Sequence, residues 1–179
     1  VRVAYFERER LDLVRLRYIE PVCSPLARSN GEALAYVGYF AELIDEWAPE
    51  ADPADALFRL GASVVESIVA GVPVGRLARY FEYWLLRLQG VYPATTTCSQ
   101  CGFEIIGEAL MAPAAGTFTC VGCKSPEQGV LLSSASLAFL QTAKTVAPTQ
   151  LGSVELPEVA DRQLSVAHRL LIKAHLDKE

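Results

Sequence analysis

The stretch TTTCSQCGFEIIGEALMAPAAGTFTCVGCKS, residues 95–125, places four of the chain's five cysteines in two C-x-x-C pairs separated by 18 residues. This spacing lies within the range of four-cysteine zinc sites, in which each tight turn presents two sulfurs to the same ion. Gly102 follows the first pair and Gly122 lies inside the second, and glycine eases such turns. The pattern therefore predicts a zinc ribbon with one structural zinc ion per chain. The four predicted ligands are Cys98, Cys101, Cys120 and Cys123.

The chemistry of these four thiols is not settled by their spacing alone. Four thiolates complete a tetrahedral shell and leave no position for a substrate water, which favours a structural zinc. The only two histidines, His168 and His175, lie far downstream, whereas a catalytic zinc usually has a histidine ligand. Two alternatives stay open: a site that holds a disulfide or has lost its metal, and a redox or catalytic use of the thiols. We expect Phe103 and Phe118 to pack behind the metal.

The composition is typical of a packed globular protein. Hydrophobic residues make up 51% of the 179 residues and charged residues 21%. No run approaches the ~20 apolar residues of a membrane span, and the first residues are too charged for a signal peptide. Paired cysteines fit a reducing compartment. We therefore expect a cytoplasmic protein. The formal net charge is −5, yet residues 29–58 hold seven acids and no base, while residues 1–28 hold six arginines and four acids. This uneven charge argues against nucleic-acid binding over the whole surface.

The apolar pattern changes period along the chain. Alternation over Val1–Ile19 predicts two half-buried strands with a turn near Glu9–Arg10. From Ser29 the spacing becomes helical. Five helices are predicted: one capped by Ser29 or Asn30 and running through Trp47, one from Asp52 and Pro53 to near Gly71, one from Pro73 to Gly90, one beginning at Ser133 or Ser134, and one from Pro157 to about Leu176. The expected fold is mainly α: a helical bundle with an inserted zinc ribbon, preceded by a short β-hairpin.

Two of the predicted helices carry rows of basic side chains that are candidates for DNA binding, because arginine and lysine bind phosphates and tyrosine can stack a base. One row, within about 80° of the helix circumference, consists of Arg76, Arg79, Tyr83 and Arg87. The other, within about 40°, consists of Arg162, Arg169 and Lys173. His168 and His175 would add charge to the second helix below neutral pH. The commoner meaning of such rows is a solvated face, or arginines paired with Glu82 and other acids.

The sequence contains no motif that supports catalysis. A Ser/His/Asp arrangement, a G-x-x-x-x-G-K-[ST] loop and a G-x-G-x-x-G loop are all absent from it. Glu42, Asp45 and Glu46 lie close together, but an acidic helix face explains them better than an active site, because no histidine or metal ligand is near them in the sequence. We therefore expect a protein that is not an enzyme.

The order of these features resembles the bacterial recombination mediator family RecO. Residues 35–43, AYVGYFAEL, are similar to that family's aromatic-x-x-E-L first helix, and residues 79–86, RYFEYWLL, with Gly90 ending the helix, are similar to its R-x-F-E-x-x-L-L segment. The C-x-x-C-G…C-x-x-C module follows, as in zinc-bearing members, and LSSASLAFL at 132–140 and AHL at 174–176 also fit. The resemblance covers roughly residues 30–176. It implies an OB-fold barrel at the start, of which Val1–Ile19 resembles only the last strands.

The resemblance implies two regions and a function. Residues 1–28 would be remnant strands of an OB-like barrel plus a linker, and residues 29–179 a helical domain with the ribbon at 95–125. A RecO-like protein would be a nucleoid-associated, non-enzymatic DNA repair and recombination mediator. It would bind single- and double-stranded DNA, anneal strands and help load the recombinase, with RecR, the single-stranded-DNA-binding protein, RecF and RecA as partners. The alternative is a zinc-stabilised protein-interaction scaffold that does not bind DNA.

Overall fold

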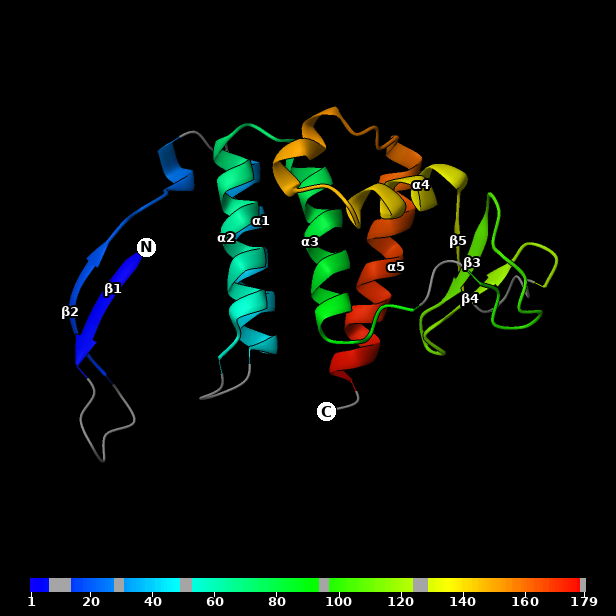
Figure 1. Ribbon diagram of the computed structural model, residues 1–179, viewed down its shortest axis with the longest axis horizontal. Coiled ribbons are helices and arrows are strands. Elements are labelled where there is room, and N and C mark those ends of the chain that lie inside the picture. Colours follow the sequence, from blue (N-terminus) through cyan, green and yellow to red (C-terminus); the bar gives the residue numbers. More distant parts are fainter. Residues whose placement is uncertain (7–13, 28–30, 49–52, 94–96, 124–128, 178–179) are drawn as a thin grey trace.

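The computed structural model describes residues 1–6, 14–27, 31–48, 53–93, 97–123 and 129–177. Figure 1 shows a row of helices with a β-hairpin at one end and a small sheet at the other. This arrangement confirms the mainly α fold with a preceding hairpin and an inserted four-cysteine ribbon. The predicted hairpin turn at Glu9–Arg10 and the predicted caps Ser29, Asn30 and Asp52 lie outside the described residues. Within the described part, no helix is both long and apolar enough to cross a membrane.

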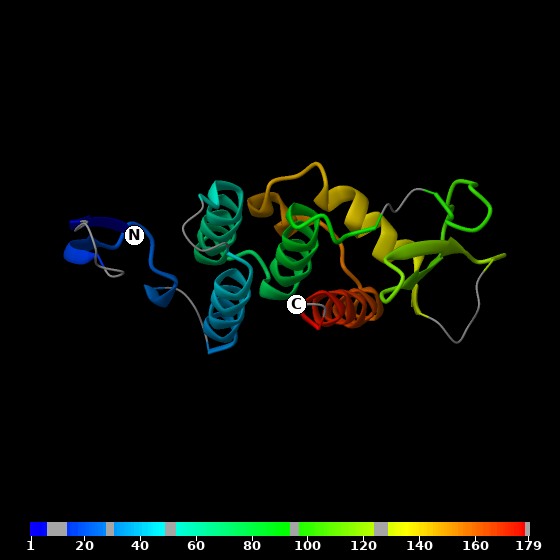
Figure 2. The same ribbon diagram turned by 90° about the horizontal axis from the view of Figure 1, so that it is seen from below.

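The hairpin consists of two antiparallel strands, β1 (Arg2–Phe6) and β2 (Arg15–Glu20), with Arg2 opposite Glu20. Its side chains are almost all exposed, and it stands apart from the helices in both views (Figures 1 and 2). The predicted strand pairing is therefore confirmed, but the half-burial is wrong, because no described element packs on either face of the hairpin. A short 3-10 helix, η1 (Pro25–Ala27), follows it and contacts the first two helices.

The helices begin and end close to the predicted residues. They are α1 (Gly31–Trp47), α2 (Asp55–Val69), α3 (Val74–Leu88), α4 (Ser134–Ala143) and α5 (Glu158–Leu176), with a 3-10 segment η2 (Pro148–Ser153). Local signals explain the agreement. Gly71 and Gly90, with φ of 87° and 69°, follow α2 and α3, where a left-handed residue ends a helix. The Ser136 N–H donates to Ser133 Oγ at 3.3 Å and so caps α4.

Helix α3 is the centre of the bundle, because α1, α2, α4 and α5 all contact it. Leu77 and Phe81 are buried, and the Phe81 ring lies 4.4 Å from that of Phe40 on α1. The other side of the helix is buried too: Arg79 is 5% exposed and Tyr83 is fully buried. Of the alternatives that the sequence left open for the basic row of this helix, a solvated face is therefore wrong at Arg79 and Tyr83.

The cysteine segment forms a three-stranded antiparallel sheet of β3 (Ala109–Ala112), β4 (Thr117–Cys120) and β5 (Val130–Leu132), in the order β4-β3-β5. Met111 on β3 lies opposite Phe118 on one side and Val130 on the other. Strand β5 contacts α4 and α5, which places the sheet against the bundle at the end away from the hairpin (Figures 1 and 2).

Candidate metal centre and basic surface

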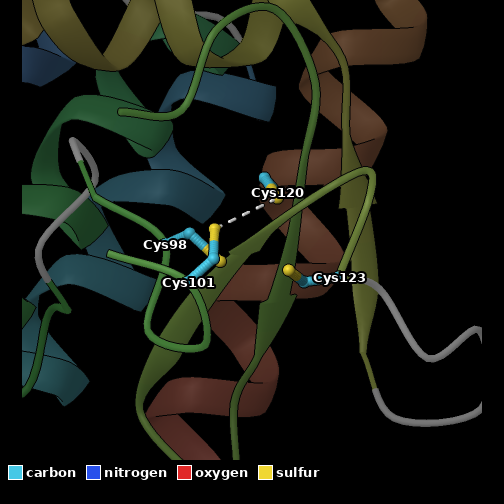
Figure 3. A group of neighbouring side chains, drawn as sticks. All are labelled: Cys98, Cys101, Cys120 and Cys123. Carbon is cyan, nitrogen blue, oxygen red and sulfur yellow. Dashed lines mark hydrogen bonds between the residues drawn. The ribbon is translucent and has the colours of Figure 1, made fainter. Parts of the chain in front are cut away.

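The four cysteines of the two C-x-x-C pairs converge on one point, as Figure 3 shows. Their sulfur atoms all lie within 4.8 Å of one another, and the Sγ atoms of Cys101 and Cys120 are 3.8 Å apart. A tetrahedral zinc site with metal–sulfur bonds of about 2.3 Å has sulfur–sulfur edges of about 3.8 Å. The four side chains therefore have both the donor type and the spacing that a tetrahedral thiophilic cation requires.

Short backbone hydrogen bonds build each turn. In the first, the Cys98 N–H donates to the Phe103 carbonyl at 2.8 Å and the Gly102 N–H donates to the Cys98 carbonyl at 2.9 Å. Gly102 has a φ of 74°, a conformation that other residues rarely adopt. In the second, the Cys123 N–H donates to the Cys120 carbonyl at 3.1 Å. The β3–β4 hairpin then brings the second turn opposite the first.

The protein environment affects the thiols in opposite directions. Backbone N–H groups of Cys120 and Cys101 donate to the Cys98 sulfur and lower the pKa of Cys98 to about 6, which favours the thiolate that binds metals. The side chains of Cys120 and Cys101, which lie beside the Cys123 sulfur, raise the pKa of Cys123 to about 12. A bound divalent cation would supply the positive charge that lets all four sulfurs ionise together.

The alternatives for these thiols receive less support from the geometry. All five cysteines are free, so a disulfide is not formed at this site. The metal-capable group contains only the four cysteines, with no histidine, within the described part of the chain. Behind the site the two predicted phenylalanines differ: Phe118 is buried as expected, whereas Phe103 is 76% exposed, so the prediction that Phe103 packs behind the metal is wrong. Its backbone carbonyl, rather than its ring, supports the turn.

A buried polar cluster, which no motif in the sequence indicates, connects the three helices α1, α3 and α5. Its centre is Glu82 on α3, which is 3% exposed. The Tyr39 hydroxyl donates to Glu82 Oε1 at 3.0 Å, and His168 Nδ1 lies 3.0 Å from Glu82 Oε2. The other ring nitrogen of His168 lies 3.1 Å from the Tyr92 hydroxyl. A neutral ring protonated at Nδ1 satisfies both contacts, because it donates to Glu82 and accepts from Tyr92. His168 is thus a core residue and not part of an exposed basic face.

An ion pair completes the cluster. Arg79 NH1 lies 2.9 Å from Glu82 Oε2, and Arg79 Nε lies 3.3 Å from Asp161 Oδ1 on α5. Both the Arg79 and Glu82 side chains are almost fully buried. Burial also raises the pKa of Asp161, although the charge of Arg79 opposes that shift. The pairing of an arginine with Glu82, which the sequence left open as an alternative to DNA contact, is therefore present at Arg79.

The predicted basic row on α3 is not a continuous surface. Arg79 and Tyr83 are buried, and Arg76 donates from NH1 to the carbonyls of Leu151 and Gly152, at 3.1 and 2.7 Å. Arg87 is exposed, donates to the Tyr83 hydroxyl at 3.0 Å and lies over the rings of Tyr83 and Trp84. The row therefore leaves only Arg87 well placed to meet a large external anion.

The predicted basic row on α5 lies on the surface. Arg162, Arg169 and Lys173 are all exposed. Arg162 pairs with Glu158 one turn earlier at 3.3 Å, an exposed contact that contributes little to stability. Arg169 also lines a cleft of about 390 Å³ between α1, α3 and α5, together with Tyr36, Tyr39 and Ser165 and with Arg79 and Glu82 of the buried cluster.

The comparison with known families decides the family of the chain. The family described as "Recombination protein O C terminal" matches residues 28–179, which include all five helices and the four-cysteine sheet. The chain belongs to the RecO family.

Individual RecO proteins give the same result. The chain is 36% identical over 126 residues to "DNA repair protein RecO" of Koribacter versatilis (strain Ellin345), an alignment that covers 69% of this chain and 51% of the relative. It is 30% identical over 153 residues to the RecO protein of Exiguobacterium sp. (strain ATCC BAA-1283 / AT1b), covering 86% and 57%. It is 28% identical over 155 residues to that of Geobacter metallireducens, covering 86% and 62%. The chain therefore spans about half to three fifths of the length of these relatives.

In this RecO-family chain, the first and last residues of the R-Y-F-E segment, Arg79 and Glu82, form the buried ion pair. An arginine and a glutamate three residues apart lie on the same side of a helix, and Arg79 and Glu82 use that spacing. The spacing was visible in the sequence, but it does not say whether the pair faces water or the core. The partners from other helices, Tyr39, Asp161 and His168, have no signal in local sequence at all.

Proposed function

We propose that this chain is part of a non-enzymatic DNA repair and recombination mediator. The observation that carries the proposal is the RecO-family match over residues 28–179, since the matched relatives are named DNA repair proteins. The proposed activities are binding of single- and double-stranded DNA, annealing of complementary strands and help in loading the recombinase. The proposed partners are RecR, the single-stranded-DNA-binding protein, RecF and RecA, in the cytoplasm at the nucleoid. We further propose residues 1–28 as the last strands of an OB-like barrel plus a linker.

The proposed cofactor is one structural zinc ion, held by Cys98, Cys101, Cys120 and Cys123. The four-cysteine donor set, with its sulfurs within 4.8 Å of one another and those of Cys101 and Cys120 3.8 Å apart, supports zinc over oxygen-preferring cations. We expect one zinc per chain by metal analysis, and four thiols that react with a thiol reagent only after a chelator is added. Cys101→Ser should lose the metal, whereas Cys23→Ser should keep it. Four thiols that react at once in a metal-free chain would contradict the proposal.

The proposed DNA contacts are the exposed cations, above all the α5 row of Arg162, Arg169 and Lys173. The first and the last of them are eleven positions apart, which is about 16 Å along the helix axis. That distance equals about five base steps along the axis of B-form DNA. Arg87 is a further proposed contact, while Arg76, Arg79 and Tyr83 are bound within the chain and are not proposed to touch DNA.

The test is fluorescence anisotropy with a labelled single-stranded oligonucleotide over a series of salt concentrations. Removing one phosphate contact should reduce the slope of log affinity against log salt by about 0.7–1. We expect this change for Arg169→Ala and not for Arg59→Ala, a matched control exposed on α2. An unchanged slope for Arg169→Ala would show that the α5 row is only a solvated face. Annealing of two complementary labelled oligonucleotides then tests the proposed activity directly.

The second candidate is a zinc-stabilised scaffold that binds proteins without contacting DNA. The net charge of −5 and the acidic α1 favour it, because both repel a polyanion. The same anisotropy experiment separates the two candidates, because a scaffold of this kind would not bind the oligonucleotide at any salt concentration in the series.

A further inference from the structure

The loop between the first cysteine pair and β3 carries two large apolar side chains in solvent. Phe103 is 76% exposed and Ile106 is 84% exposed, more than any other large apolar side chain of the described residues. A single exposed apolar residue needs no explanation, but here two lie within four positions of one loop. Val121, in the turn of the second cysteine pair, is also exposed, and the clustered sulfurs hold that turn beside the first.

The loop is held in a defined shape. Gly102 and Gly107 have φ of 74° and 82°, so both ends of the loop are tight turns. Between them, Ile105 packs against the core while its neighbours point outward. A β-bridge between Thr97 and Glu104 and the hydrogen bond from the Cys98 N–H to the Phe103 carbonyl tie the loop to the cysteine turn. An apolar contact on such a preorganised loop loses little conformational entropy on binding.

The charge of the ribbon says which kind of surface would bind this loop. The ribbon at 95–125 contains two acids, Glu104 and Glu108, and one base, Lys124, which lies outside the described residues. In the sequence, Glu104 follows Phe103 directly and lies two residues before Ile106. A DNA backbone would be repelled here, whereas a protein surface with basic side chains around an apolar hollow would match both the charge and the shape.

We propose that Phe103 and Ile106 form a docking knob for a partner protein whose surface presents an apolar hollow edged by lysine or arginine. The inference rests on the proposed function only for the choice of partners to test. The knob lies at the opposite end of the molecule from the hairpin (Figures 1 and 2). A partner bound there would therefore leave the hairpin end of the chain free.

The experiment titrates labelled chain, loaded with zinc, against purified RecR and purified single-stranded-DNA-binding protein from the same organism. The test variant is Phe103→Ser with Ile106→Ser, and the control is Phe58→Ser, which removes a phenylalanine that is 70% exposed on α2. Loss of two central apolar anchors should weaken binding of one of these proteins by about 30-fold or more. Glu104→Lys should weaken it as well, and the wild-type affinity should fall with salt. Zinc content and circular dichroism of the variants show that they are folded.

The outcomes separate this inference from the proposed function. Strong loss in the double variant, with DNA binding and annealing unchanged, supports the knob. Equal binding of wild type and double variant, or binding of neither partner to the wild type, overturns it, even where DNA binding and annealing confirm the proposed function. Loss of self-association as the only effect of the double variant would also overturn it, because the occupant would then be a second copy of the chain.

Discussion

Replacing Glu82 by glutamine should strongly destabilise this protein, because Glu82 is the acceptor on which the buried cluster depends. The carboxylate is 3% exposed and has three partners on three helices: the Tyr39 hydroxyl, the His168 ring and the Arg79 guanidinium. Glutamine has almost the same shape, so the substitution changes charge and hydrogen bonding without opening a cavity.

The magnitude follows from what the partners lose. Without the carboxylate, Arg79 keeps only the partly exposed Asp161 as a counter-charge, and removing one member of a buried ion pair costs about 3–5 kcal/mol. The glutamine amide can also point an N–H₂ group at the donor of His168, which leaves a buried donor unpaired. We therefore expect the free energy of unfolding to fall by about 3–5 kcal/mol, a large part of the roughly 5–15 kcal/mol that holds an ordinary domain folded.

Urea unfolding of the zinc-loaded protein, followed by circular dichroism and by fluorescence of Trp47 and Trp84, measures this change. Glu42→Gln, on the exposed side of α1, is the matched control and should change stability by less than about 0.5 kcal/mol. The double variant Arg79→Met with Glu82→Gln should recover part of the loss, because it removes the buried guanidinium that has lost its counter-charge and keeps an amide oxygen that can accept from the cluster.

Two results would refute this reasoning. If the free energy of unfolding of Glu82→Gln lies within about 1 kcal/mol of the wild-type value, the charge of Glu82 does not stabilise the cluster. If the double variant is less stable than Glu82→Gln alone, the loss comes from packing and not from an uncompensated charge.

Two further predictions concern other parts of the fold. Burial raises the pKa of Tyr39 and Tyr92, and the charge of Glu82 adds to this at Tyr39. Above about pH 10 the unfolded chain releases these protons while the folded chain keeps them, so the free energy of unfolding should be constant below about pH 10 and fall above it. Urea midpoints and phenolate absorbance measured across that range test this expectation. Gly129→Ala should destabilise the ribbon, because the new Cβ would overlap the Met111 carbonyl, whereas Gly152→Ala meets no atom within 4 Å and should be neutral in thermal unfolding.

The parts of the fold that local sequence specifies were predictable. The helix ends followed from Gly71, Gly90 and the Ser133 cap, which act within one or two turns of the chain. The cysteine site followed from the spacing of two turns, since each C-x-x-C pair contributes two ligands whatever surrounds it. In both cases the deciding interactions join residues that are close in sequence.

Most of the predictions that were wrong concern residues whose burial depends on contacts between segments distant in sequence. A helical wheel shows which residues of α3 share a face, but it cannot show that Asp161 of α5 pairs with Arg79 or that the Tyr92 ring packs against Tyr83. Glu82 bonds residues 43 positions before it and 86 positions after it, and no local pattern encodes those partners. The prediction for Phe103 was wrong for a local reason. An apolar residue beside a metal site was expected to be buried, but the tight turn at Gly102 points the Phe103 side chain outward.

The buried cluster and the cysteine site together fix how the ribbon sits on the bundle. Tyr92, just after α3, contacts His168 of the cluster through its hydroxyl, and its ring lies 6.4 Å from that of Phe118 on β4. The same strand ends at Cys120 of the metal-capable group. One strand is thus held from the bundle side by an aromatic and polar contact and from the outer side by the cysteine turns. Two anchors on one strand restrict rotation of the ribbon, so we expect the loop of Phe103 and Ile106 and the basic row of α5 to keep fixed positions relative to each other.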